Sequence, residues 1–274
     1  MKYVIVLGDG MAGEPLAELG GKTTLATART PILDEMAKVS EQGLAKMVPD
    51  GMAPGSDTAN LSVAGYNPRI YYTGRSPLEA LSIGVQMETE DVAFRCNIVT
   101  LSEDEECYED RRILDHSSGE ISTADASVLI DAVREGLARE GYEFYVGTSY
   151  RHLLIWKAGQ VVELTPPHDI LTKNIRDYLP SDAILKEMMV KSYDILQNHP
   201  INVERRRQGL NPANSIWFWG AGTRPALSSF QEKTGKSGVM ISAVDLLKGI
   251  AVGAGMGLAQ YAIDSAIFHD KFYS

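Results

Sequence analysis

Residues 52 to 68 contain the first candidate for chemistry, a serine at the start of a predicted helix. Pro54-Gly55 predicts a turn, and Asp57 and Thr58 begin a short helix that ends near Ala64. Ser56 therefore lies at or just before a helix N-terminus, where free backbone N–H groups and the helix dipole favour negative charge. A hydroxyl there can lose its proton or carry a phosphoryl group. The alternative is that Ser56 is only an N-cap, a role that serine often takes.

Asp9 is the second candidate. It follows Lys2–Leu7, an apolar segment typical of a buried strand. A carboxylate at the end of a parallel strand lies where α/β sheets bind ligands, and it is a hard metal ligand. Residues 8–13 also match the G-x-G-x-x-G pattern of dinucleotide-binding proteins. That alternative requires a helix directly after the glycines, and Pro15 and Gly20-Gly21 interrupt any helix there.

Arginines and histidines are candidates for holding an anionic substrate. Arginine binds carboxylates and phosphates through paired hydrogen bonds, and the chain offers Arg95, Arg151 and the run Arg205–Arg207. Taken alone, that run is typical of an exposed helix end. His152 and His168, taken alone, are typical of hydrogen-bonded structural histidines.

The elements that must position these residues alternate between helices and strands. Residues 31–43 predict an amphipathic helix and residues 44–48 a second strand, so that strand, helix, strand and serine loop follow in the order of an α/β sheet. A small α+β insert is expected next. Its predicted strands are 92–101, 143–146, 152–156 and 160–164, and its predicted helical segments are 122–137 and 183–208. Segments 215–219 and 239–241 predict strands that return to the first sheet, followed by a helix over 245–257.

Bulk composition limits the function classes. The chain has 274 residues, 44% hydrophobic residues and a net charge of −10. This charge argues against non-specific nucleic-acid binding and against an anionic membrane surface. A phosphorylated substrate is compatible with this net charge, because arginines gathered at one site can make the local electrostatic potential positive. The two cysteines lack metal-site spacing, and no signal peptide or membrane-length apolar run is visible, so we expect a cytoplasmic protein.

Together, these segments resemble the alkaline phosphatase superfamily. More narrowly, the chain is similar to the archaeal-type cofactor-independent phosphoglycerate mutases and the related proposed homoserine kinases. The resemblance is carried by Asp9-Gly10 and by residues 54–62, 72–80, 92–97, 149–154, 165–170, 211–214, 217–220 and 241–250. These motifs follow one another in order over nearly the whole chain.

The resemblance implies an α/β fold with an alkaline-phosphatase-like core sheet and an inserted α+β substrate-binding domain. The core would comprise residues 1–69 and 236–274, and the insert residues 70–235. Ser56 would be transiently phosphorylated, and Asp9 and Ser56 would bind two divalent ions, Mn²⁺ or Mg²⁺, with Zn²⁺ as a further candidate. Phosphate would move from one hydroxyl of 3-phosphoglycerate to Ser56 and back to the neighbouring hydroxyl. The implied substrate-binding residues are Asp57, Arg95, Asn97, Arg151, His152, His168, Asp169 and Arg206.

Several departures from the family pattern keep alternatives open. The motifs around the family's second metal are absent, and the resemblance ends near Gly255, so we expect a core sheet that is incomplete at its C-terminus. The family has tyrosine and histidine where this chain has His116 and Glu120. The first hypothesis is a phosphoglycerate mutase. The second is a related phosphotransferase for another alcohol such as homoserine. The third is a fragment that only binds a ligand, or that associates with a partner or a second copy as a homo-oligomer.

Overall fold

The computed structural model describes residues 1–8 and 10–259, and the chain divides into two units, residues 1–46 and residues 47–274. The first unit contains a 3₁₀ helix η1 (Ala17–Leu19) and the helices α1 (Thr24–Thr27) and α2 (Pro31–Val39). The helix predicted from Pro31 is confirmed, although it ends at Val39. None of the described residues of this unit is buried, so the unit has no core of its own.

The predicted strands at 2–7 and 44–48 are wrong for this structure. Both segments are without strand structure, and Val4 in the first is 83% exposed. The composition of Lys2–Leu7 suits a strand. However, β propensity measures how side chains fit a pleated, half-buried surface, and it is realised only beside a partner strand.

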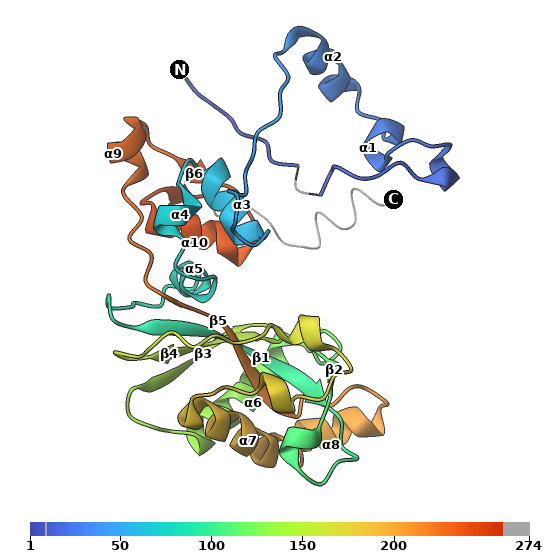
Figure 1. The fold of residues 1–274 in the computed structure, drawn as a ribbon, viewed down its shortest axis with the longest axis vertical. Helices are drawn as coiled ribbons and strands as arrows, with labels where there is room; N and C mark the ends of the chain where they lie inside the picture. The colour runs from blue at the N-terminus through green and yellow to red at the C-terminus, as the bar shows by residue number, and fades with distance from the viewer. Residues whose placement is uncertain (9, 260–274) are drawn as a thin grey trace. The chain divides into compact units, whose positions relative to one another are not determined.

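An antiparallel sheet forms the centre of the second unit (Figure 1). Its central strand β1 (Val92–Leu101) pairs on one side with β4 (Arg151–Trp156), which pairs with β3 (Tyr142–Thr148). On the other side β1 pairs with β5 (Ser215–Thr223) and, near its end, with β2 (Ile113–Asp115). All ten residues of β1 are buried, which requires that both faces of the sheet are covered.

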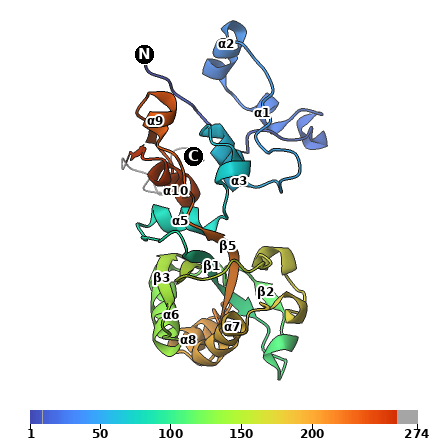
Figure 2. The ribbon, with the colours of Figure 1, turned by 60° about the vertical axis from the view of Figure 1, so that its left-hand side comes forward.

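The helices α6 (Thr123–Gly136) and α7 (Ala183–Leu196) cover one face of this sheet (Figures 1 and 2). The largest hydrophobic core lies between them and the strands and includes Trp217, Phe94 and Leu129. The prediction of a helix over 122–137 is confirmed. The helical region predicted over 183–208 is two helices, because Pro200 cannot continue α7 and instead begins α8 (Pro200–Arg207) with His199 as its N-cap.

A second group of helices lies on the other side of the sheet (Figure 1). It contains α3 (Ser56–Val63), α4 (Pro68–Tyr71), α5 (Ser76–Ser82), α9 (Phe230–Thr234) and α10 (Asp245–Gly253). Beside α10, β6 (Val239–Met240) pairs in parallel with β7 (Gly257–Leu258). Residues of α3, α5 and α10 share a small core that includes Leu61, Leu78 and Ile250.

The fold class expected from the sequence, a mixed α/β fold, is confirmed, but two further strand predictions differ from the structure. Residues 160–164 form no strand. Residues 215–219 do form a strand, yet β5 pairs with β1 inside the antiparallel sheet and does not return to another sheet. Short 3₁₀ helices, η2 (Tyr108–Asp110), η3 (Pro167–Ile170) and η4 (Arg176–Tyr178), complete the connections. The described part of the chain contains no helix with the length and apolarity that a membrane span requires.

Candidate functional site

Ser56 is the first residue of α3, and its side chain is exposed. The N-cap is Gly55, whose backbone is extended with φ −163° and ψ 152°. The alternative interpretation of Ser56 as the N-cap is therefore wrong in this structure. The hydroxyl lies in the first helical turn, where backbone N–H groups are unsatisfied and negative charge is stabilised.

Asp57 ties the start of α3 to the end of α4. One carboxylate oxygen accepts a hydrogen bond from the Thr58 backbone N–H (2.9 Å), and the other accepts one from the Tyr72 hydroxyl (2.7 Å). Burial and this bond to Asp57 raise the pKa of Tyr72, so its hydroxyl stays protonated as a donor. With both oxygens engaged and the side chain buried, Asp57 positions the helix that carries Ser56.

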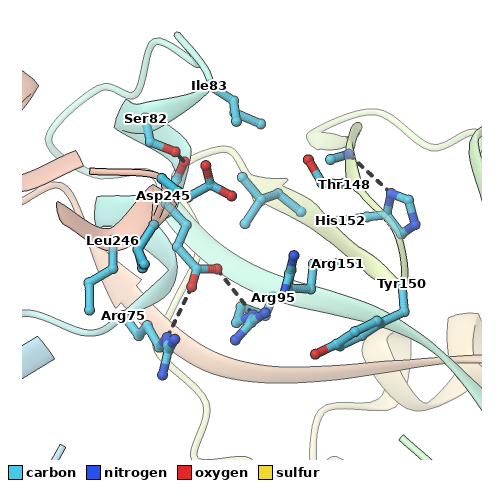
Figure 3. A pocket seen from close by; sticks show the side chains of 15 residues that line it. Arg75, Ser82, Ile83, Arg95, Thr148, Tyr150, Arg151, His152, Asp245 and Leu246 are labelled. Atoms are coloured by element: carbon cyan, nitrogen blue, oxygen red, sulfur yellow. Dashed lines mark hydrogen bonds and ion pairs between the residues drawn. The ribbon is translucent and has the colours of Figure 1, made fainter. Parts of the chain in front are cut away.

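A cavity of about 280 Å³ lies beside the sheet at the N-terminus of α10 (Figure 3). Three arginines line it, and they come from different elements: Arg75 precedes α5, Arg95 is on β1 and Arg151 begins β4. Of the residues named from the sequence, the structure brings together Arg95, Arg151 and His152. It adds Arg75, Glu79, Tyr150 and Asp245, which sequence reasoning missed as site residues.

Glu79 holds two of the arginines in place. One of its carboxylate oxygens accepts from Arg75 Nε (3.0 Å), and the other lies 3.1 Å from Arg95 Nε. Arg95 is buried and its guanidinium stacks over the Trp219 ring at 4.5 Å. Burial lowers the pKa of Arg95 while Glu79 opposes this shift, and an arginine stays charged under such conditions. Three guanidiniums and two carboxylates, those of Glu79 and Asp245, line the cavity, so the lining is cationic in a chain with a net charge of −10.

His152 is a buried, neutral histidine among the residues that line the same cavity. Its Nδ1 accepts a hydrogen bond from the Gly147 backbone N–H (3.1 Å), which assigns the ring proton to Nε2. His152 is 1% exposed, and Nε2 has no hydrogen-bond partner among the described residues. Burial lowers the pKa of His152 to about 3, so the ring is neutral near pH 7.

The protonation of His152 predicts how stability depends on pH. The unfolded chain takes up this proton near the ordinary pKa of 6.5, whereas the folded chain resists it down to about 3. Stability is therefore lost as the pH falls below the unfolded value, and we expect His152 to account for about 2 kcal/mol between roughly pH 7 and pH 5. Urea unfolding of His152→Asn, whose amide oxygen can replace Nδ1 as acceptor, should show a correspondingly flatter slope over this range. An unchanged slope would contradict a buried neutral histidine.

A second polar cluster adjoins the cavity through Trp219 and Tyr150. Asn97 accepts from Trp219 Nε1 (3.0 Å) and donates to the His116 carbonyl (3.2 Å). The His168 ring lies against Trp219 (5.3 Å) and His116 (6.0 Å), and His116 lies against Tyr150 (5.8 Å). Burial lowers the pKa of His168, and the arginines of the cavity add to this shift.

The remaining members of the expected substrate site differ in their placement. Asp169 lies 3.8 Å from His168 Nε2 and therefore joins this second cluster. Asn97 is buried with both ends of its amide engaged, so it fixes Trp219 and the His116 backbone in the structure shown. His116, noted from the sequence as a departure from the family pattern, lies within the cluster.

Arg206 is not brought to the cavity. Its guanidinium forms two hydrogen bonds with the Glu103 carboxylate, one of them 3.0 Å long from Nε, at the end of α8. The arginine run does lie in the last turn of α8, but the alternative of an exposed helix end holds only for Arg207, because Arg205 is buried and Arg206 is partly buried. Ser56 is likewise not among the residues that line the cavity.

The described residues do not fit a divalent metal centre. Within residues 1–8 and 10–259, no three side chains of His, Cys, Asp or Glu are grouped closely enough to hold an ion. Asp9, the expected metal ligand, lies outside the described residues. The expected metal pair Asp9 and Ser56 is therefore not tested by this geometry.

Comparison with known proteins identifies the family. The family model of the 2,3-bisphosphoglycerate-independent phosphoglycerate mutases matches residues 37–202. The mutase of Methanosarcina barkeri is 49% identical over 265 residues, which cover 95% of this chain and 65% of the relative's own length. The chain thus spans about two thirds of the length of the curated relatives it matches.

Two solved structures are similar in fold. A protein from Pyrococcus horikoshii shares 28% identity at a TM-score of 0.69, covering 92% of this chain and 59% of that one. The cofactor-independent phosphoglycerate mutase of Thermoplasma acidophilum shares 26% identity at a TM-score of 0.51, covering 91% of this chain and 66% of that one. With a family model that covers more than half of its residues, this chain belongs to the 2,3-bisphosphoglycerate-independent phosphoglycerate mutase family.

Proposed function

We propose that this chain carries out the reaction of its family, the interconversion of 3-phosphoglycerate and 2-phosphoglycerate through a phosphoserine at Ser56. The observation that supports this most is the cavity lined by Arg75, Arg95 and Arg151 in an acidic protein. A phosphoglycerate carries a phosphate and a carboxylate, and each is a natural partner for a guanidinium. The reaction is glycolytic, so the proposal places the protein in the cytoplasm, with a small phosphorylated substrate and no nucleic-acid or membrane partner.

The cavity can bind both anionic groups of such a substrate. Arg151 forms no ion pair among the described residues and stacks on the Tyr150 ring at 5.1 Å, so its donors are available to a ligand. Arg75 and Arg95 are held at a fixed spacing by Glu79. His152 lines the cavity as a neutral ring and is proposed to assist in binding. His168 and Asp169 adjoin this site through Trp219 and are proposed to assist in binding.

Phosphoryl transfer then occurs in two steps, first to Ser56 and then back to the glycerate. In the first, Ser56 Oγ forms a bond to phosphorus as the bond between phosphorus and the substrate's C3 oxygen breaks, and the proton lost by Ser56 ends on that oxygen. In the second, the C2 oxygen of the glycerate takes the phosphoryl group and its proton returns to Ser56. The helix N-terminus stabilises the phosphoserine. Because Ser56 does not line the cavity, the transfer requires α3 and the cavity to approach each other.

The divalent ions implied by the family resemblance remain part of the proposal as Mn²⁺ or Mg²⁺, two per site, with Zn²⁺ as a further candidate. Asp9 and Ser56 are the proposed ligands. The domain assignment is proposed in the same way, with residues 70–235 as the substrate-binding part and residues 1–69 and 236–274 as the part that carries Ser56. One wall of the cavity comes from residues 243–246, so both parts would touch the substrate.

Binding of 3-phosphoglycerate by calorimetry tests the substrate site. Arg151→Gln removes one guanidinium that has no ion pair within residues 1–8 and 10–259, so affinity should fall about 10- to 100-fold with little effect on folding. The matched control is Arg176→Gln, an exposed arginine that pairs with Glu109 and Asp110 and does not line the cavity. The control should bind as the unmodified chain does. Equal affinity in both variants would contradict the assignment of the cavity.

A further inference from the structure

A second cavity, of about 220 Å³, lies between η2 and the surface of α7, and the proposed mutase chemistry does not use it. The residues that line it combine one buried cation, two tyrosines and two exposed carboxylates: Glu106, Tyr108, Arg111, Val190, Tyr193, Asp194 and Gln197. Its volume is below the roughly 300–1,000 Å³ typical of pockets for drug-sized ligands, which points to a small molecule.

Arg111 is the unusual member of this lining. It is only 7% exposed, one of its terminal nitrogens donates to the Ser102 carbonyl (2.6 Å), and its guanidinium stacks on the Tyr193 ring at 4.0 Å. Its Nε is buried without a hydrogen-bond partner among the described residues. The Glu103 carboxylate, whose pKa Arg111 helps to lower, is already held by Arg206.

The Arg111 guanidinium lacks a paired carboxylate among the described residues. Within the part of the chain that the structure describes, Arg111 forms no ion pair with a carboxylate, although charged groups this deeply buried are normally paired. The tyrosine beside it does not supply a negative charge. Tyr108 is neutral, because burial raises its pKa, and its hydroxyl is hydrogen-bonded to Ser215 Oγ (2.9 Å).

The two carboxylates of the lining narrow the class of ligand. Glu106 and Asp194 are exposed, whereas Arg111 is buried, so the cavity is cationic inside and acidic toward solvent. A simple anion would be attracted by Arg111 and repelled by these carboxylates. A molecule with a carboxylate at one end and an ammonium group at the other would complement both.

We propose that this cavity binds a small zwitterion with the chemistry of a free α-amino acid. Its carboxylate pairs with the Arg111 guanidinium, and its ammonium group lies between Glu106 and Asp194. The rings of Tyr108 and Tyr193, whose centroids are 6.0 Å apart, form the apolar wall beside the aliphatic part of the ligand.

Three probes test the proposal by calorimetric titration of the full chain. L-alanine carries both charges, propionate only the carboxylate and L-alaninamide only the ammonium group. L-alanine should bind saturably, propionate about tenfold more weakly, and L-alaninamide not at all. Absence of saturable L-alanine binding, or equal binding of propionate, would overturn the proposal.

Two sets of variants assign the contacts. Glu106→Gln with Asp194→Asn changes only exposed side chains, so the fold is retained, and it should remove the preference for L-alanine over propionate. Glu90→Gln, an exposed glutamate outside the cavity, is the matched control and should keep that preference. Arg111→Lys retains the charge but not the paired donors, and it should weaken L-alanine binding by about tenfold or more. An unchanged preference in the double variant overturns the proposal even if Arg111→Lys fails to fold.

Discussion

Ser56→Ala is expected to lower the interconversion of 3-phosphoglycerate and 2-phosphoglycerate by more than about 1,000-fold, because it removes the proposed phosphoryl acceptor, and the Thr58 hydroxyl in the same helical turn is buried and donates to the Gly55 carbonyl. Binding of 3-phosphoglycerate should be unchanged, since Ser56 does not line the arginine cavity. Folding should also be unchanged. Ser56 is exposed at the first position of α3, and Gly55 provides the N-cap.

The measurement is a ³¹P NMR time course with 3-phosphoglycerate and added Mn²⁺. Ser127→Ala is the matched control, because Ser127 is a partly exposed helical serine on α6 whose hydroxyl donates to the Thr123 carbonyl (2.7 Å). The control should turn over substrate at the rate of the unmodified chain. Turnover that survives Ser56→Ala would show that another group accepts the phosphoryl group.

Gly249→Ala is expected to destabilise the packing of α10 on α5 by about 2–3 kcal/mol. Helix propensity alone predicts the opposite, because alanine is favoured over glycine by about 1 kcal/mol inside a helix. However, a Cβ added at Gly249 would overlap the backbone carbonyl of Leu78. Backbone atoms cannot turn aside as a side chain can, so the two helices must separate, and such overpacking costs roughly 1–3 kcal/mol or more.

Gly253→Ala on the same helix separates the effect of helix propensity from the effect of the clash with backbone. A Cβ there would meet the Leu227 side chain at 2.9 Å, and that side chain can change its rotamer. Its urea unfolding midpoint, followed by circular dichroism, should lie close to that of the unmodified chain, whereas the midpoint of Gly249→Ala should fall. If Gly249→Ala were as stable as Gly253→Ala, the close contact between α5 and α10 would be wrong.

Local sequence signals predicted the elements whose causes are local. The Pro54-Gly55 turn placed the start of α3, and the serine cap and apolar spacing placed α6. The alternation of residue types over 92–101 predicted β1. In each case the caps, turns or side-chain periodicity act within a few residues, so the chain itself contains the information.

Strand partners could not be predicted in this way. Lys2–Leu7 has the composition of a strand but no pairing in this structure, and β5 pairs with β1 although more than 100 residues separate them. Which strands become neighbours depends on contacts between distant parts of the chain, and these leave no local signal.

The sequence predicted some residues of the candidate site and missed others. Motif resemblance named Arg95, Arg151 and His152, which the structure places around one cavity, but their roles remain predictions. Arg75 and Glu79 were missed because their spacing of four residues is typical of an ordinary surface ion pair on a helix. Only the packing of α5 against the sheet brings Glu79 to Arg95 and turns this pair into part of the cavity.

The most direct test of the central claim is whether this chain itself converts 3-phosphoglycerate into 2-phosphoglycerate when Mn²⁺ is supplied. The proposed function predicts that the ³¹P signal of 2-phosphoglycerate appears and approaches equilibrium, and that the same signal is absent with Ser56→Ala. If 3-phosphoglycerate binds saturably but no 2-phosphoglycerate forms, the proposed mutase activity is wrong for this chain, although its family membership stands.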